Sequence, residues 1–138
     1  MHENELSHEI IAAALEVHRQ HGPGLVESVY EESLCHELHL RSIPFRRQQP
    51  VPIQYKGIKL ASDLRLDLLV PDLVIVDNKA KEAILPIDRA KLLTYLRLTG
   101  KRLGLLINFH CELLRDGIVR IVNGLDSDPL PPPGSFKL

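Results

Sequence analysis

Two aspartates and a lysine interrupt a mostly apolar stretch near the middle of the chain. They are Asp67, Asp77 and Lys79, in the run 67–79 (Asp-Leu-Leu-Val-Pro-Asp-Leu-Val-Ile-Val-Asp-Asn-Lys). Side chains alternate between the faces of a strand, so Asp77 and Lys79 are predicted to point the same way. If residues 71–73 form a three-residue loop, Asp67 lies opposite Asp77 on that same face. Burying these charges is costly unless they bind a ligand or one another.

Two carboxylates and an ammonium are the groups that metal-assisted hydrolysis of a phosphodiester requires. Mg²⁺ binds oxygen ligands and keeps several waters, so two or three carboxylates suffice to hold it. A nearby lysine can orient the attacking water or offset negative charge. Glu27, on a predicted helix, could add a further oxygen ligand. The alternative is an edge-strand salt bridge of Lys79 with Asp77 or Asp67, and the spacing alone does not exclude it.

Helices and strands must position these residues, and the apolar pattern predicts where they lie. Helical spacing of apolar residues predicts three helices, over residues 4–20, 25–40 and 89–99. Asp88 is a plausible cap for the third. The buried stripe of the second helix is predicted to consist of Val26, Val29, Tyr30, Leu34 and Leu38.

From residue 43 onward the pattern changes to that of strands. Strands are predicted on both sides of a turn at Lys56-Gly57, and then at residues 74–76, 103–109 and 118–122. A strand, a helix and a strand in succession imply a right-handed crossover and a parallel pair. The sequence therefore predicts an α/β sandwich with a mixed central sheet. Its order is two helices, three antiparallel strands, a helix, a strand and a short final strand.

Length and composition indicate one ordinary globular domain. The 138 residues allow a substantial core, which we assign to residues 1–125, and the Pro-rich residues 126–138 predict a flexible tail. The net charge of -1 argues against a surface that is basic throughout, although a local basic patch is allowed. Two cysteines are too few for a disulfide framework. The sequence shows no signal core and no run of ~20 apolar residues, so we expect a cytoplasmic protein.

The segment Gly24-Leu25-Val26-Glu27-Ser28-Val29-Tyr30 carries a specific motif, and further pieces follow it in a fixed order. They are Tyr55-Lys56-Gly57, residues 65–70 (Arg-Leu-Asp-Leu-Leu-Val), 92–96 (Leu-Leu-Thr-Tyr-Leu) and 105–109 (Leu-Leu-Ile-Asn-Phe). Over about residues 5–125 the chain resembles the GxxExxY protein family, which is similar to the PD-(D/E)XK nuclease superfamily. The resemblance implies a three-layer-like sandwich with a restriction-endonuclease-like core. That core is a helix, three strands, a helix and a strand, here with an additional N-terminal helix.

The resemblance also implies roles for individual residues. Asp67 would be the motif aspartate, Asp77 the acidic metal ligand and Lys79 the motif lysine. Glu27 would be the helix carboxylate that assists in catalysis and metal binding, and Tyr30 a neighbouring support. The metal would be Mg²⁺ or Mn²⁺.

Two positions depart from the family pattern. The family usually has Glu-x-Lys where this chain has Asp77-Asn78-Lys79, and Gln where this chain has Lys91. The shorter aspartate can leave the magnesium shell incomplete, because Mg²⁺ demands near-ideal geometry. A cation at Lys91 could pair with Asp77 and compete for it.

Residues 41–62 contain no aspartate or glutamate. The basic residues of this stretch, together with two basic residues nearer the third predicted helix, could contact successive phosphates of a nucleic acid. This predicted nucleic-acid-binding set is Arg46, Arg47, Lys56, Lys59, Lys81 and Arg89. The alternative is a strand edge protected from aggregation by charge.

Histidine and cysteine also occur at spacings that could hold zinc. They are His18 with His21, Cys35 with His36 and His39, and His110 with Cys111. No CxxC pair accompanies them, so scattered surface histidines and a core cysteine at position 35 are the simpler interpretation.

Two functional hypotheses follow. The first is a nuclease-like protein that uses Mg²⁺ or Mn²⁺ to hydrolyse phosphodiester bonds of DNA or RNA. The second is a catalytically impaired nuclease fold that binds nucleic acid or protein as an assembly module, because Asp77 and Lys91 depart from the pattern. No membrane partner is expected, and a homo-oligomer or a protein partner is compatible with both hypotheses.

Overall fold

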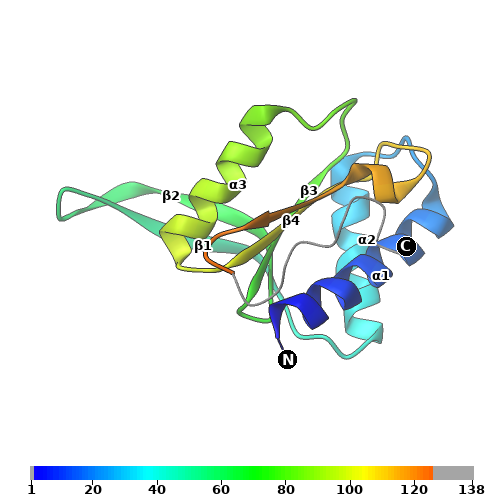
Figure 1. The fold of residues 1–138 in the computed structure, drawn as a ribbon, viewed down its shortest axis with the longest axis horizontal. Coiled ribbons are helices and arrows are strands. Elements are labelled where there is room, and N and C mark those ends of the chain that lie inside the picture. The colour runs from blue at the N-terminus through cyan, green and yellow to red at the C-terminus, as the bar shows by residue number, and fades with distance from the viewer. Residues whose placement is uncertain (1, 126–138) are drawn as a thin grey trace.

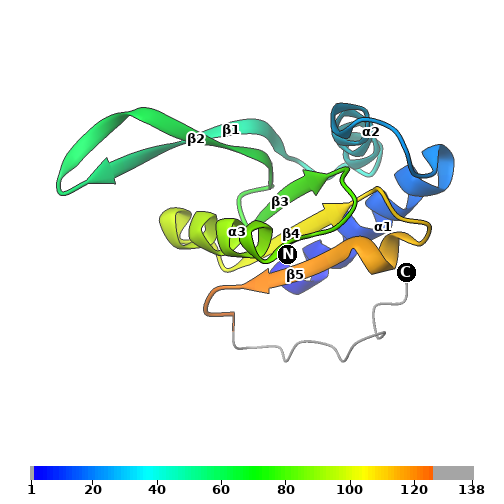
Figure 2. The same ribbon diagram turned by 90° about the horizontal axis from the view of Figure 1, so that it is seen from above.

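The computed structural model describes residues 2–125. Its elements are α1 (Glu3–His21), α2 (Glu27–Leu40), β1 (Arg46–Tyr55), β2 (Ile58–Val70), β3 (Val74–Lys79), α3 (Pro86–Thr99), β4 (Leu103–Asn108), η1 (Leu114–Gly117) and β5 (Ile118–Val122). The strands form one sheet in the order β1-β2-β3-β4-β5 (Figures 1 and 2). No helix within residues 2–125 is long and apolar enough to cross a membrane. The tail predicted at residues 126–138 lies outside the described part of the chain.

The sheet is mixed, as predicted. β1, β2 and β3 pair antiparallel, and β5 is antiparallel to β4. β3 and β4 pair in parallel and are connected by α3. Nearly every residue of these two strands is buried, because helices cover both faces of a parallel pair.

Two apolar clusters place the sheet in the middle of three layers. On one face, α1 and α2 pack against the sheet through residues such as Ile10, Leu34 and Val76. On the other face, α3 contributes Leu92 to a smaller cluster that includes Ile75. Ile75 and Val76 belong to different clusters because side chains alternate along β3. Burying one such side chain contributes roughly 1.5–3 kcal/mol, so both helical layers hold the sheet. The predicted sandwich with an additional N-terminal helix is confirmed.

The starts of two helices differ from the sequence predictions. α3 begins at Pro86, whose fixed φ suits a first helical position, and Leu85 is its N-cap. Asp88 is therefore not the cap. It lies in the first turn, where its Oδ2 accepts a hydrogen bond of 2.7 Å from the backbone N–H of Leu85. Val26 is the N-cap of α2 and is 66% exposed, so its assignment to the buried stripe is wrong.

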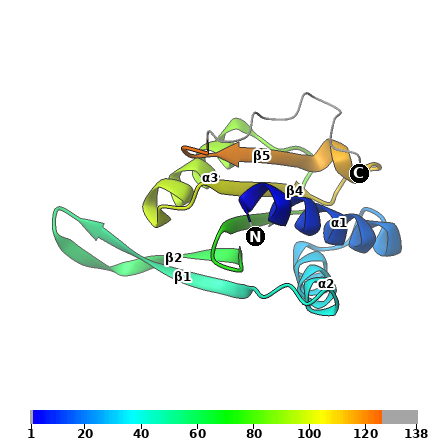
Figure 3. The same cartoon turned by 60° about the horizontal axis from the view of Figure 1, so that its bottom comes forward.

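The outer ends of β1 and β2 form an arm that projects from the rest of the fold (Figures 1 and 3). β2 pairs with β3 only at residues 68–70, whereas it pairs with β1 along most of its length. We use the term arm for residues 52–63. The predicted turn at Lys56-Gly57 is confirmed and forms the tip of the arm.

Candidate functional site

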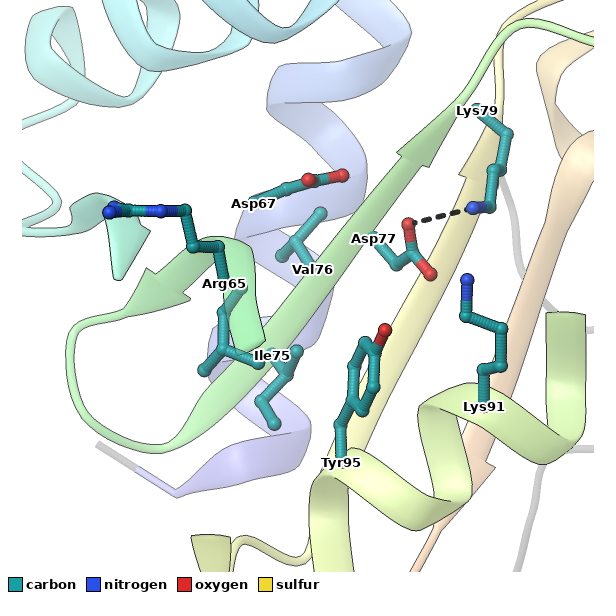
Figure 4. Close-up of a pocket in the computed structure, with 9 residues that line it drawn as sticks. Arg65, Asp67, Ile75, Val76, Asp77, Lys79, Lys91 and Tyr95 are labelled. Atoms are coloured by element: carbon teal, nitrogen blue, oxygen red, sulfur yellow. Dashed lines mark ion pairs between the residues drawn. The ribbon is translucent and has the colours of Figure 1, made fainter. Parts of the chain in front are cut away.

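The hairpin of β2 and β3 brings Asp67 and Asp77 together. Residues 71–73 form the predicted three-residue loop, and the antiparallel register then places Asp67 opposite Asp77. The backbone N–H of Asn78 donates a hydrogen bond of 2.8 Å to Oδ2 of Asp67. The expectation that the two carboxylates share one face of the hairpin is confirmed (Figure 4).

Both carboxylates line a small pocket of about 130 Å³. Lys79 points the same way as Asp77, and its Nζ lies 3.4 Å from Oδ1 of Asp77. Lys91 reaches toward the same carboxylate from α3 (Figure 4). The polar and charged residues that line the pocket are Arg65, Asp67, Asp77, Lys79, Lys91 and Tyr95.

Ionising both carboxylates in this pocket is costly. Burial raises the pKa of Asp67 to about 7; the Asn78 N–H opposes this rise and the charge of Asp77 adds to it. The pKa of Asp77 is also raised, chiefly by burial, against the opposing influence of Lys79 and Lys91. Lys79 pairs with Asp77, but this one ammonium does not neutralise both carboxylates. A further cation would favour the ionised form of the pair.

Lys79 is an ammonium in this arrangement. Burial acts to lower its pKa, but the charge of Asp77 and the hydrogen bond between the two side chains outweigh burial. The pKa of Lys79 is consequently raised. Lys79 can therefore orient a water or stabilise negative charge, and it is not poised to accept a proton.

The fold and this pocket agree with the comparison against models of protein families. Residues 4–121 match the PD-(D/E)XK nuclease superfamily. The chain belongs to this superfamily. No curated protein and no solved structure gives a significant match. PD-(D/E)XK nucleases act on nucleic acids and generally use divalent metal ions, so a nuclease-like function is supported. The finer resemblance to the GxxExxY family rests on the sequence motifs.

In this PD-(D/E)XK chain, Glu27 lies outside the pocket lining. It is the first residue of α2 and is exposed. Its partial burial raises its pKa, the charge of Lys79 lowers that pKa and the charge of Asp77 raises it, so Glu27 lies within electrostatic reach of both residues. Within residues 2–125, no three or more His, Cys, Asp and Glu residues are grouped closely enough to hold a metal ion. The role of Glu27 as a third ligand stays a prediction.

A second carboxylate on α2, which the sequence reasoning missed, is the buried Glu31. Its carboxylate accepts hydrogen bonds from Nε of Arg47 at 2.7 Å and from Nε2 of Gln48 at 3.1 Å. Gln48 has a φ of 54°, a conformation that is uncommon outside glycine. The charge of Glu31 also contributes to the raised pKa of Asp67. The available signal was its spacing of four residues from Glu27, which places both on one helix face.

Two further residues of the pocket were not predicted as part of the site. Arg65 lies two residues before Asp67 on β2, and this spacing places both side chains on one face of a strand. Tyr95 lies four residues after Lys91 on α3, which places both on one face of a helix. In Figure 4 the Tyr95 ring points into the pocket beside Asp77. Tyr95 also packs against the smaller apolar cluster.

The motif tyrosine, Tyr30, holds the start of α2 in place. It is fully buried, and its ring stacks on Phe109 with centroids 4.6 Å apart. Its hydroxyl donates a hydrogen bond of 2.6 Å to the carbonyl of Gly22 and accepts one of 3.1 Å from the N–H of Leu25. Tyr30 thus fixes the turn that precedes Glu27, and its role as a support of the site stays a prediction.

Replacing Tyr30 by phenylalanine is expected to lower the free energy of unfolding by about 1–3 kcal/mol, because two backbone groups lose their partner. Urea denaturation followed by circular dichroism measures this change. Tyr55→Phe is the matched control, because Tyr55 is 62% exposed on the arm. Equal stability of the two variants would contradict the assigned role.

The six predicted nucleic-acid-binding residues fall into two groups. Arg47 pairs with Glu31 at 2.7 Å, and Lys81 pairs with Asp88 at 2.7 Å. Their charges are thus compensated within the chain. The other four residues are exposed, and they are Arg46 at the start of β1, Lys56 and Lys59 on the arm, and Arg89 on α3.

Three of the residues considered for zinc make other contacts in the fold. Nε2 of His18 lies 2.8 Å from the carbonyl oxygen of Cys111, and Nε2 of His21 lies 2.8 Å from Oγ of Ser33. Cys35 is buried, and burial raises the pKa of its thiol to about 11. The prediction of a core cysteine is therefore confirmed.

Proposed function

We propose that this protein hydrolyses phosphodiester bonds of nucleic acids with Mg²⁺ or Mn²⁺. The observation that carries the proposal is the pair of Asp67 and Asp77, with Lys79 beside it, in a chain of the PD-(D/E)XK superfamily. The raised pKa values mean that the fold disfavours the ionised pair, which a bound cation would stabilise. Perturbed titratable groups in one pocket are typical of functional sites.

The donor set suits one Mg²⁺ ion. Asp67 and Asp77 would supply carboxylate oxygens, and water would complete the shell, because Mg²⁺ commonly binds proteins through one or two carboxylates. When bound, the ion would supply positive charge to the phosphate and lower the pKa of water. Glu27 would assist from the first turn of α2.

Two cationic residues of the pocket would act on the substrate itself. The ammonium of Lys79 would orient the attacking water and stabilise negative charge that develops on the phosphate. Arg65 would bind a phosphate oxygen, since a guanidinium matches phosphate geometry. Nη1 of Arg65 donates a hydrogen bond of 3.3 Å to the carbonyl of Gln48, which restrains the side chain beside the pocket.

The proposal is tested by hydrolysis assays with the purified protein. Labelled single-stranded and double-stranded DNA and RNA are incubated with Mg²⁺, with Mn²⁺ or with EDTA. We expect cleavage of at least one substrate with metal and none with EDTA. A protein that cleaves none of the four substrates with either metal would contradict the proposal.

A second candidate function is a nuclease fold that binds nucleic acid or protein without catalysis. Lys91 favours it, because its ammonium points toward Asp77 and lowers the pKa of that carboxyl, as a bound metal would (Figure 4). The shorter side chain of Asp77 favours it as well. In either case the cytoplasmic location and a homo-oligomer or protein partner remain predictions from the sequence.

The double variant Asp77→Glu with Lys91→Gln is expected to bind Mn²⁺ about tenfold more tightly than the natural chain, because a competing positive charge is removed and the acid gains reach. Titration calorimetry measures the affinity. The combination of Asp77→Glu with Arg89→Gln is the control, since Arg89 is exposed on the same helix and does not line the pocket. If both double variants bind Mn²⁺ equally, Lys91 does not compete for the site.

A further inference from the structure

The arm is a two-stranded ribbon that no other layer of the fold covers. Every residue from Gln54 to Asp63 is exposed. The arm extends away from the three helices in all three views (Figures 1, 2 and 3). Two strands without a packed face are only marginally stable, so a projecting ribbon of this kind is not explained by the core of the fold.

The tip of the arm carries large apolar side chains together with positive charge. Tyr55 and Ile58 are paired across the two strands and are 62% and 66% exposed. Leu60 is 39% exposed, and the Lys56 ammonium lies 5.4 Å from the centroid of the Tyr55 ring. The pair of Gln54 and Lys59 is the next along the ladder and lies on the opposite face.

Charge is distributed unevenly between the arm and the helical layer. The arm holds two lysines, Lys56 and Lys59, near its tip and one acidic residue, Asp63, at its base, whereas residues 1–40 hold eight glutamates and one arginine. The arginines at positions 41 and 47 are already paired with glutamates of α2, so the lysines of the arm carry the uncompensated positive charge of this region together with Arg46. A ligand of the arm is therefore expected to be an anion. A nucleic acid meets this requirement over a long surface, because its phosphates repeat along the chain.

We propose that the arm inserts into the major groove of duplex DNA and holds the duplex so that one strand reaches the pocket of Asp67 and Asp77. This inference rests on the proposed nuclease function and names duplex DNA as its substrate. The major groove of B-form DNA admits a two-stranded β-ribbon, whereas the major groove of duplex RNA is too deep and narrow. Arg65 lies on β2 between the arm and Asp67, so one strand connects the bound groove to the cleavage site.

A second copy of this chain is the competing occupant of the arm. A groove of about 390 Å³ between α1 and α2 is lined by Glu16, Glu32 and Glu37, among others, and could receive a basic tip. Glu16 pairs with Arg19 at 2.7 Å and Glu37 pairs with Arg41 at 2.8 Å. Two of the three glutamates are thus compensated within the chain, and duplex DNA is the better match in charge.

The test is binding in EDTA, measured by fluorescence anisotropy on 20-base-pair duplex DNA, on duplex RNA and on single-stranded DNA of one sequence. The double variant Lys56→Ala with Lys59→Ala is expected to lose about tenfold in affinity for duplex DNA. Its plot of log affinity against log salt should flatten by about 2, because each lost phosphate contact removes roughly 0.9 from the slope. Duplex RNA should bind more weakly than duplex DNA, and the variant should bind RNA and single strands nearly as the natural chain does.

Arg97→Ala with Arg115→Ala is the matched control, because both residues are exposed, lie outside the arm and remove the same charge. Equal loss in both double variants, or no loss in the arm variant, would overturn the inference. Sedimentation that shows a dimer which the arm variant dissociates, with duplex affinity unchanged, would assign the arm to self-association instead. Arm-dependent binding without hydrolysis in Mg²⁺ or Mn²⁺ would overturn the nuclease function and leave the arm as a DNA-binding element.

Discussion

Lys79→Ala is expected to lower the rate of phosphodiester hydrolysis about 10²–10³-fold, the usual effect of removing one group that stabilises developing charge. The side chain of Lys79 is 18% exposed, and its Nζ lies 3.4 Å from Oδ1 of Asp77 at the pocket. The loss should appear in kcat more than in KM, because Lys79 is expected to act on the transition state. Rates are measured under multiple turnover on the best substrate.

Lys101→Ala is the control for this substitution. Lys101 is also a partly buried lysine in an ion pair, at 3.3 Å from Asp72, but it lies outside the pocket. We expect its variant to retain full activity. If Lys79→Ala hydrolyses the substrate as fast as Lys101→Ala does, the pocket is not the catalytic site.

Asp67→Asn is expected to stabilise the fold at pH 8 and to abolish Mn²⁺ binding. At pH 8 the carboxyl of Asp67 is ionised in both the folded and the unfolded chain, and the folded chain bears the cost of burying it beside Asp77. The asparagine removes that charge and can still accept the hydrogen bond from Asn78. We expect a gain of about 1–2 kcal/mol in the free energy of unfolding, since one pKa unit corresponds to about 1.4 kcal/mol and solvent at the pocket screens part of the cost of the buried charge.

The stability that Asp67→Asn gains over the natural chain should decrease as the pH falls. The pKa of Asp67 in the folded chain is about 7, above its ordinary value of 3.8, so the folded state takes up a proton first as the pH falls. The natural chain is therefore stabilised between pH 7 and pH 4, and the advantage of the variant shrinks over that range. Denaturation at pH 8 and pH 5 measures the difference, with the exposed Asp63→Asn on the same strand as the control. An advantage that grows toward pH 5 would contradict the raised pKa.

These two substitutions separate the roles of the pocket. If Asp67 lowers the stability of the fold and is nevertheless required for metal binding, its carboxylate is retained for a ligand at a cost in stability. If Asp67 itself served only as a structural partner of a cation within the fold, its replacement would instead lower the free energy of unfolding. The sign of the stability change at pH 8 therefore distinguishes a cation site from an internal ion pair.

Local sequence patterns were sufficient for the fold and for the centre of the site. The alternation of β3 places Asp77 and Lys79 on one face, and a three-residue loop places Asp67 opposite them. The continuous apolar run at residues 103–109 and the helix before it predicted the parallel pair. These features depend on strand and helix periods, which a sequence displays directly. The predicted helix starts were less accurate, because α3 begins at Pro86, before the cap predicted at Asp88.

The tertiary structure alone decided which other residues reach that centre. α3 packs on the sheet through Leu92 and Leu96, and this packing brings Lys91 and Tyr95 to the pocket. Glu27 does not line the pocket, because α2 lies with α1 on the opposite face of the sheet. Arg47 and Lys81, which the sequence offered as phosphate contacts, find carboxylates within the chain, whereas Lys56 and Lys59 project on the arm. Residue spacing predicts which side chains share a face of one helix or strand. The distances between side chains of different elements follow from packing across the three layers.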